Sequence, residues 1–349
     1  MGGQAPRCSL LDMTEAVSWY AGELRRELGI RNRRWARDYA HAESYGNPPV
    51  IVYSPGEGRH GNFFDPAYAA ITSRPEWMRR FKKIHAQGRA LPKAESGRLW
   101  RELDSSMSSD ALLMNVFCTP GVAESCAVRN ALGVDGGGEP EFGWKAGAPL
   151  EGGRVDRTEV DMRWGGLLVE AKLTEGDFQT CREGLVERYS EFGEVFDREK
   201  LRKVEFRAAR RRVAVEFAEE FTQEWEETAE SAEVSREFQN AIVARGRATE
   251  AVEVGYAGYQ LIRNVLAARA DGCSFCVLHD ARRPDLREQW FQVMSAVKSA
   301  ELRVRLKVMT WQELAVLLPE NLQDFLDLKY GIVAPGTAAS PVGDSGDLE

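Results

Sequence analysis

The chain has 349 residues, of which 43% are hydrophobic and 29% charged, and its formal net charge is −8. These values fit a globular protein with one large domain or two modest ones. No apolar run approaches the roughly 20 residues that cross a bilayer, and the N-terminus lacks the basic-then-apolar pattern of a secretory signal. We therefore expect a cytoplasmic protein without a membrane partner.

The cysteines and histidines do not predict a zinc site. Cys273 and Cys276 form the one Cys-x-x-Cys pair among 6 cysteines, and they lie in an apolar stretch typical of a buried strand. The chain has only 4 histidines, which argues against a histidine-built metal centre. We expect reduced core thiols at Cys273 and Cys276.

Positive charge is concentrated near the N-terminus. Residues 1–100 hold 16 Lys and Arg against 10 Asp and Glu, a balance of +6, which leaves 30 against 44, or −14, for the remainder. Nucleic acid responds to local potential rather than to the charge of the whole chain. The asymmetry therefore permits a phosphate-binding surface.

Residues 1–105 predict a basic region of helices and loops without strong strand signals. Residues 16–28 have helical spacing, and residues 47–61 are rich in Pro and Gly, which indicates a loop. Residues 77–85 interleave aromatic and basic side chains, which suits nucleic-acid backbone neutralisation with base stacking. A helix with one apolar and one solvated face explains the same pattern and is the favoured interpretation.

Residues 106–335 predict an α/β domain with a mixed sheet. Strands are predicted over residues 142–146, 158–164, 167–173, 274–279 and 303–309. Helices are predicted over residues 108–117, from an N-cap at Thr119 with Pro120 to Leu132, across a charged insertion at about 176–253, over 256–268, and after a capping box of Thr310 and Glu313. Residues 336–349 have the composition of a disordered tail.

The hairpin of the second and third predicted strands is the most informative part of the chain. Gly165 and Gly166 form a two-residue turn signal, because such turns need positive φ. The register that follows pairs Trp164 with Leu167, Arg163 with Leu168, Met162 with Val169, Asp161 with Glu170, and Glu159 with Lys172.

Side chains alternate between the two faces of this hairpin. The apolar face would hold Val160, Met162, Trp164, Leu167, Val169, Ala171 and Leu173. The other face would hold Glu159, Asp161, Glu170 and Lys172. Carboxylates opposite one another repel, so Asp161 and Glu170 need compensation, either from Lys172 and nearby arginines or from a divalent cation.

This hairpin resembles the active-site signature of the PD-(D/E)XK nuclease superfamily, the restriction-endonuclease-like fold: Asp161, 8 intervening residues, then Glu170-Ala171-Lys172. Val160 stands where the signature usually has proline. The predicted order of helix, three-strand meander, helix, strand, helix and strand also agrees with the core of that superfamily. Residues 108–111 and 259–264 are similar to a poorly characterised branch of predicted restriction endonucleases, whereas residues 1–105 lie outside the resemblance.

The resemblance implies a metal-dependent phosphodiesterase, and most naturally a DNA endonuclease. Asp161, Glu170 and the carbonyl of Ala171 would hold Mg²⁺ or Mn²⁺. Lys172 would contact the scissile phosphate and help lower the pKa of the attacking water, while metal charge stabilises the in-line transition state. A homodimer or a co-acting protein partner is compatible with this function.

Several alternatives stay open at this point. Glu124 is either a further metal-site carboxylate or a surface residue, and Glu159 is either an outer carboxylate or the ion-pair partner of Lys172. Gln260 and Arg263 are either substrate contacts or polar residues of a helix surface. The chain could instead be a degenerate nuclease that binds nucleic acid or protein without cleavage, or a helical interaction protein built around residues 176–270. The sequence does not decide between DNA and RNA, or between endonuclease and exonuclease.

Overall fold

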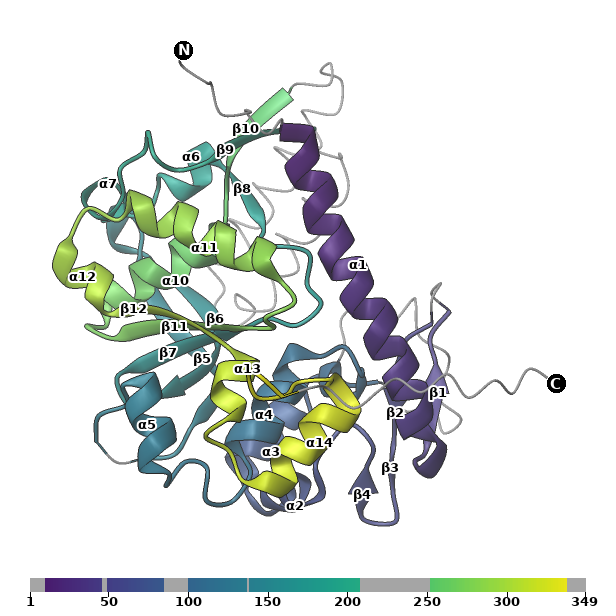
Figure 1. Cartoon of the computed structure of the whole chain (residues 1–349). Helices are drawn as coiled ribbons and strands as arrows, with labels where there is room; N and C mark the ends of the chain where they lie inside the picture. The colour runs from purple at the N-terminus through teal and green to yellow at the C-terminus, as the bar shows by residue number, and fades with distance from the viewer. Residues whose placement is uncertain (1–9, 46–48, 85–99, 137, 208–251, 338–349) are drawn as a thin grey trace, which may run out of the picture.

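A mixed sheet of 5 strands, in the order β12-β11-β7-β6-β5, forms the centre of the chain (Figure 1). The computed structural model describes residues 10–45, 49–84, 100–136, 138–207 and 252–337. The strands are β5 (Glu141–Pro149), β6 (Val155–Trp164), β7 (Leu167–Ala171), β11 (Ser274–His279) and β12 (Leu306–Thr310). β5, β6 and β7 form an antiparallel meander, and β11 and β12 run parallel to β7. The predicted α/β class with a mixed sheet is confirmed.

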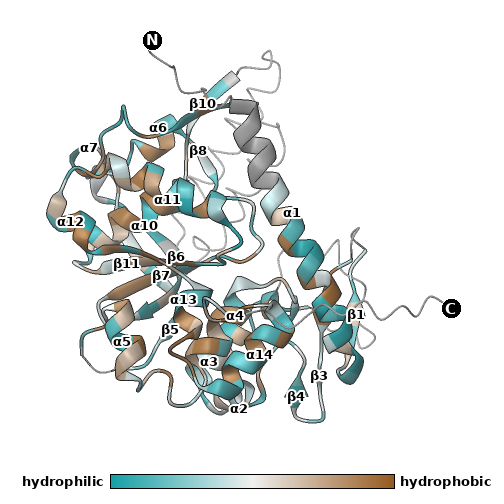
Figure 2. Cartoon of the chain, in the orientation of Figure 1, coloured by the Kyte–Doolittle hydropathy of each residue, from teal (hydrophilic) through white to brown (hydrophobic). Residues whose placement is uncertain are grey.

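Helices cover both faces of this sheet. One face packs on α10 (Tyr259–Ala270) and α11 (Pro284–Ala296). The other packs on α4 (Ser109–Phe117), α5 (Cys126–Leu132), α13 (Trp311–Ala315) and α14 (Glu320–Tyr330). Because β7 and β11 are buried on both faces, they are nearly continuous apolar runs, which appear brown in Figure 2.

The other elements extend this core. Before α4 the chain forms α1 (Leu10–Trp35), η1 (Ala36–Asp38), β1 (His41–Glu43), β2 (Ile51–Tyr53), β3 (Pro55–Gly56), β4 (Arg59–His60), α2 (Asp65–Ser73), α3 (Pro75–Phe81) and η3 (Glu102–Asp104). After β5 it forms η4 (Glu151–Gly153), β8 (Thr180–Arg182), α6 (Glu183–Val186), α7 (Phe192–Val195), β9 (Lys203–Arg207), β10 (Val252–Ala257) and α12 (Ala300–Val304). None of the described helices has the length and apolarity needed to cross a bilayer.

Many of the predicted elements are confirmed. The hydroxyl of Ser108 caps α4, and Thr310 with Glu313 forms the expected capping box of α13. Trp77 and Phe81 are buried core residues of α3, which supports the amphipathic-helix interpretation of residues 77–85 rather than base stacking. Buried free thiols occupy positions 273 and 276, and burial raises the pKa of Cys276 to about 12.

The predicted start of one helix and the predicted start of one strand are wrong. α5 begins at Cys126 with Ser125 as its cap, whereas the hydroxyl of Thr119 donates to the carbonyl of Asn115 and closes α4. Residues 303 and 304 belong to α12, whose cap is Ser299, so the last strand is shorter than predicted. Ser and Thr can cap or close a helix, and tertiary packing decides which of these roles each residue takes.

Two predictions based on local composition also fail. Residues 47–61 were expected to form a loop but contain β2, β3 and β4, because the apolar run of β2 pairs with β1 and is buried. Residues 176–207 were expected to be helical but form β8, β9 and two short helices. β8 and β9 both pair with β10, a partner far along the chain that local propensity does not register. Residues 208–251 and 338–349 lie outside the described residues, and the predicted domain boundary near residue 105 stays a prediction.

α1 packs against α14 through a buried lysine. Lys329 is fully buried, donates to the side-chain oxygen of Asn32 at 2.6 Å, and lies 4.2 Å from the ring centroid of Tyr53. Burial lowers the pKa of Lys329 well below its ordinary value. This junction therefore holds a side chain whose charged form is disfavoured by folding.

We expect Lys329→Met to reduce the pH dependence of stability. Between the lowered folded pKa and the unfolded value of about 10.4, the unfolded chain binds more protons at Lys329 than the folded chain. The free energy of unfolding should therefore rise with pH in this window, by at most about 1.4 kcal/mol per pH unit from this group. Urea unfolding at several pH values should show a weaker rise for Lys329→Met than for the exposed control Lys82→Met, and equal slopes would contradict the expectation.

Candidate active site

The hairpin keeps its predicted register beside the turn and then opens. Its ladder pairs Trp164 with Leu167, Arg163 with Leu168, and Met162 with Val169, as predicted. Beyond these pairs the strands separate, so the predicted pairings of Asp161 with Glu170 and of Glu159 with Lys172 are wrong. Instead, Oδ2 of Asp161 accepts a hydrogen bond at 2.7 Å from the backbone N–H of Ala171. A side chain thus replaces the backbone ladder at this point.

A distortion of β5 accompanies the separation. The pairs on either side place Gly143 opposite Asp161, and Gly143 has a φ of +65°, which glycine adopts at no steric cost. The alternation of β6 changes at the same place, because Val160 packs in the core of one sheet face and Met162 in the core of the other. The prediction that both residues share one face is therefore wrong.

Glu170 and Lys172 lie at the end of β7 and are nearly inaccessible, with exposed fractions of 3% and 5%. Nζ of Lys172 donates to Oε1 of Glu170 at 2.7 Å. Nδ2 of Asn264, a fully buried residue of α10, donates to Oε2 of the same carboxylate at 2.9 Å. The face that was predicted to be polar is therefore covered by a helix, and its charges are held in fixed positions.

Burial and neighbouring charges shift the pKa values of Asp161 and Lys172. Burial, followed by the negative charges of Glu170 and Asp110, raises the pKa of Asp161 well above its ordinary value. Burial opposes the charge of Lys172, but Glu170, Glu175 and Asp161 outweigh it and raise the pKa of Lys172. The ammonium of Lys172 therefore stays charged at neutral pH, whereas ionisation of Asp161 is costly without further positive charge.

Two further carboxylates, Asp110 of α4 and Glu175, lie at the N-terminal end of α4, and sequence reasoning did not assign them to the site. Asp110 is close enough to Asp161 to raise its pKa. Glu175, in the loop after β7, accepts from the hydroxyl of Ser109 at 2.5 Å and from the N–H of Leu173 at 2.7 Å. The signal available for Asp110 was its position in the first turn of a predicted helix, which does not reveal what that turn faces.

A buried arginine holds the loop that carries Glu175. Arg283 is fully buried, and its guanidinium donates to the carbonyls of Leu173, Glu175 and Gly176 at 3.3, 2.6 and 3.0 Å. These carbonyls belong to the loop that directly follows Lys172. Sequence reasoning missed Arg283, because only the tertiary structure places it behind this loop.

The residues that the sequence left open lie as follows. Glu124 is exposed and directly precedes the cap of α5. Glu159 accepts from Nζ of Lys83 at 2.9 Å rather than from Lys172. Gln260 is half-buried on α10, and the guanidinium of Arg263 lies 5.4 Å from the ring centroid of Tyr259 on the same helix.

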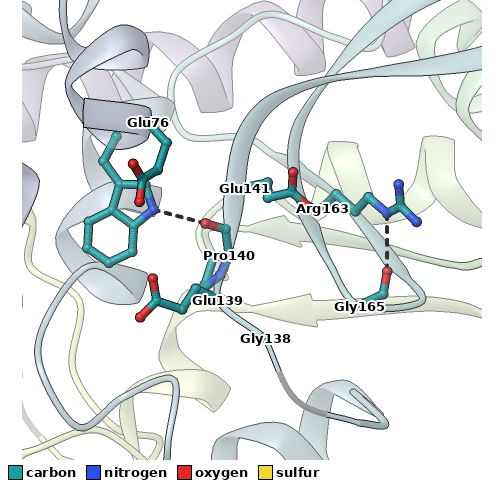
Figure 3. A pocket seen from close by; sticks show the side chains of 8 residues that line it. Glu76, Gly138, Glu139, Pro140, Glu141, Arg163 and Gly165 are labelled. Atoms are coloured by element: carbon teal, nitrogen blue, oxygen red, sulfur yellow. Dashed lines mark hydrogen bonds between the residues drawn. The ribbon is translucent and has the colours of Figure 1, made fainter. Parts of the chain in front are cut away.

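A separate surface pocket of about 420 Å³ lies beside the turn of the hairpin (Figure 3). It is lined by Glu76, Trp77, Gly138, Glu139, Pro140, Glu141, Arg163 and Gly165. The indole of Trp77 donates to the carbonyl of Pro140 at 3.0 Å, and the guanidinium of Arg163 donates to the carbonyl of Gly165 at 3.2 Å, which fixes two walls of the pocket. None of the lining residues is Asp161, Glu170 or Lys172, so this pocket is distinct from the charged site.

The oxygen donors of the charged site fit a hard divalent cation. Within the described residues, no group of 3 or more His, Cys, Asp or Glu side chains is arranged to hold a metal. Mg²⁺, however, is commonly bound by one or two carboxylates and keeps several waters. Asp161 and Glu170 are such a pair, and burial together with the charge of Glu170 raises the pKa of Asp161.

The chain is an α/β protein with a central mixed sheet. Its charged site groups carboxylates and one lysine at the end of β7, where the hairpin opens. A family model described as "Restriction Endonuclease associating with ARP" matches residues 33–331. The chain belongs to this family, which supports the predicted relationship to restriction endonucleases. The match begins within α1, so it includes most of the N-terminal part that the resemblance had left out. Comparison with curated proteins and with solved structures yields no match.

Removing the charge of Asp161 should stabilise the protein in EDTA. The raised pKa of Asp161 means that folding disfavours its ionised form at neutral pH. Asp161→Asn keeps the shape and an acceptor oxygen for the N–H of Ala171, and should raise the free energy of unfolding by about 1 to 3 kcal/mol. Thermal unfolding in EDTA, with the exposed Asp324→Asn as control, measures the change. A variant less stable than both wild type and control would contradict the expectation.

Proposed function

We propose that this chain is a metal-dependent nuclease of the PD-(D/E)XK type, which hydrolyses phosphodiester bonds in DNA. The observation that carries the proposal is the arrangement at the end of β7. There, Lys172 is paired with Glu170, and Asp161 reaches across the open hairpin to the N–H of Ala171. The family description supports the same function. So does the sheet, in which β11 comes after the meander in the chain and runs parallel beside β7.

Asp161, Glu170 and the backbone carbonyl of Ala171 would hold Mg²⁺ or Mn²⁺. When bound, the ion would supply positive charge to the phosphoryl oxygens of the transition state. Its arrival would also offset the repulsion that raises the pKa of Asp161. An ionised carboxylate offers about four lone-pair positions, so Glu170 can accept from Lys172 and Asn264 and still donate to a cation.

Lys172 would bind the scissile phosphate. Its ammonium is kept charged by Glu170, Glu175 and Asp161, and the bond to Glu170 fixes its direction. A charge that is already oriented stabilises the developing negative charge of the transition state without reorganisation. Asn264 would help to orient Glu170, because its amide donates to the second carboxylate oxygen of Glu170.

A partner would supply part of the affinity for DNA. The net charge of the chain is −8, and carboxylates pair with Arg80, Lys83 and Lys172 near the site. Phosphate contacts by Lys and Arg provide a large share of the affinity in protein–DNA complexes. A second copy of the chain, or a protein partner such as the one that the family description mentions, would meet this need.

The decisive test is cleavage of plasmid and single-stranded DNA with Mg²⁺, Mn²⁺ or EDTA. We expect wild type to nick DNA only with metal, and Lys172→Ala and Asp161→Ala to lose at least about 100-fold in rate, because each removes charge stabilisation of the transition state. The exposed controls Lys82→Ala and Asp324→Ala should cleave like wild type. If no form cleaves DNA or RNA and wild type does not bind Mn²⁺ in calorimetry, the proposal fails in favour of a non-cleaving binding protein.

Asn264→Leu should test the support of Glu170. The side chains are similar in size and the position is fully buried, so the fold should persist while Glu170 loses its amide donor. Residues that orient a metal ligand typically contribute about 10- to 100-fold in activity, and here we expect the loss in kcat with KM little changed. Asn130→Leu, at an exposed position of α5, is the control. A change confined to KM would argue that Asn264 contacts substrate instead.

A further inference from the structure

α3 brings a buried arginine to the carboxylates around Asp161. The side chain of Arg80 is only 5% exposed. One of its terminal nitrogens lies 3.0 Å from Glu102 and 3.4 Å from Glu159, and the other pairs with Asp110. Arg80 therefore joins carboxylates from three separate parts of the chain.

The side chain of Arg80 packs closely against Gly143 of β5. A Cβ at position 143 would lie 3.2 Å from Cδ of Arg80. Gly143 is also the residue opposite Asp161 at the distortion of β5. Gly143 therefore lies beside Arg80 and opposite Asp161, so Arg80 packs where the hairpin opens.

Asp110 is the carboxylate that connects Arg80 with Asp161. The charge of Asp110 contributes to the raised pKa of Asp161, and Asp161 in turn acts electrostatically on Arg80. The planar guanidinium can bind several carboxylates at fixed angles, whereas an ammonium is a compact point charge without this geometry. The position of the Asp110 carboxylate relative to Asp161 therefore depends on Arg80.

We propose that Arg80 is a positioning residue of the nuclease site: it fixes the Asp110 carboxylate beside Asp161 and thereby sets the affinity of the site for a divalent cation. The inference rests on the proposed function. It makes the N-terminal part of the chain a component of the site, although the sequence resemblance begins only after residue 105. Lys83, which contacts Glu102 and Glu159, belongs to the same support.

The test compares Arg80→Lys with Arg79→Lys in the full chain. Both keep the charge, but Arg79 is exposed on the same helix, so it controls for the chemical change. Mn²⁺ affinity is measured by calorimetry and cleavage under single-turnover conditions. We expect Arg80→Lys to weaken Mn²⁺ binding and to slow cleavage by about 10-fold or more, in the range typical for residues that orient metal ligands, and Arg79→Lys to match wild type.

A double-variant cycle then identifies the route of the effect. In an Asp110→Asn background, Arg80→Lys should change Mn²⁺ affinity by less than about 2-fold, because the carboxylate that it positions is gone. An Arg80→Lys protein that matches Arg79→Lys, or an equal effect of Arg80→Lys in both backgrounds, would overturn the inference. If wild type itself neither binds Mn²⁺ nor cleaves, the proposed function fails, which is a different result from normal wild-type activity with an unaffected Arg80→Lys.

Discussion

The hydrogen bond from the N–H of Ala171 to the carboxylate of Asp161 is the contact on which the site depends. The backbone ladder of the hairpin stops at Met162 and Val169, and this bond holds the two strands where the ladder no longer does. A fully paired hairpin would satisfy the N–H of Ala171 with backbone and would direct Asp161 elsewhere. The opening of the strands thus places the carboxylate of Asp161 beside the end of β7.

Helices on both faces of the sheet and in the N-terminal part contribute side chains to the group of charges at this opening. Asn264 of α10 donates to Glu170, and Arg80 of α3 pairs with Asp110 of α4, whose negative charge adds to that around Asp161. Buried charges are costly unless each is paired or hydrogen-bonded. Burial and the remaining negative charges keep the pKa of Asp161 well above its ordinary value, so its ionised form is not fully compensated in the folded chain.

The N-terminal part is joined to the core at two places. Lys329 of α14 reaches Asn32 of α1, and Arg80 of α3 reaches Asp110 of α4. Both contacts are buried, so they restrict the position of the N-terminal part more strongly than surface ion pairs would. The family match, which starts at residue 33, agrees with a functional unit that includes α2 and α3.

The sequence by itself determined the α/β class, most strands of the sheet, the turn at Gly165, and the proximity of Asp161, Glu170 and Lys172, because alternation, turn chemistry and capping act over a few residues. Tertiary structure alone decided that the hairpin opens at Asp161, that Val160 and Met162 face opposite layers, and that Arg80, Asp110 and Asn264 meet there. The same holds for β8 and β9, whose partner strand β10 begins only at Val252. Such contacts depend on which distant segment packs beside a strand or helix, and short-range sequence patterns do not determine this.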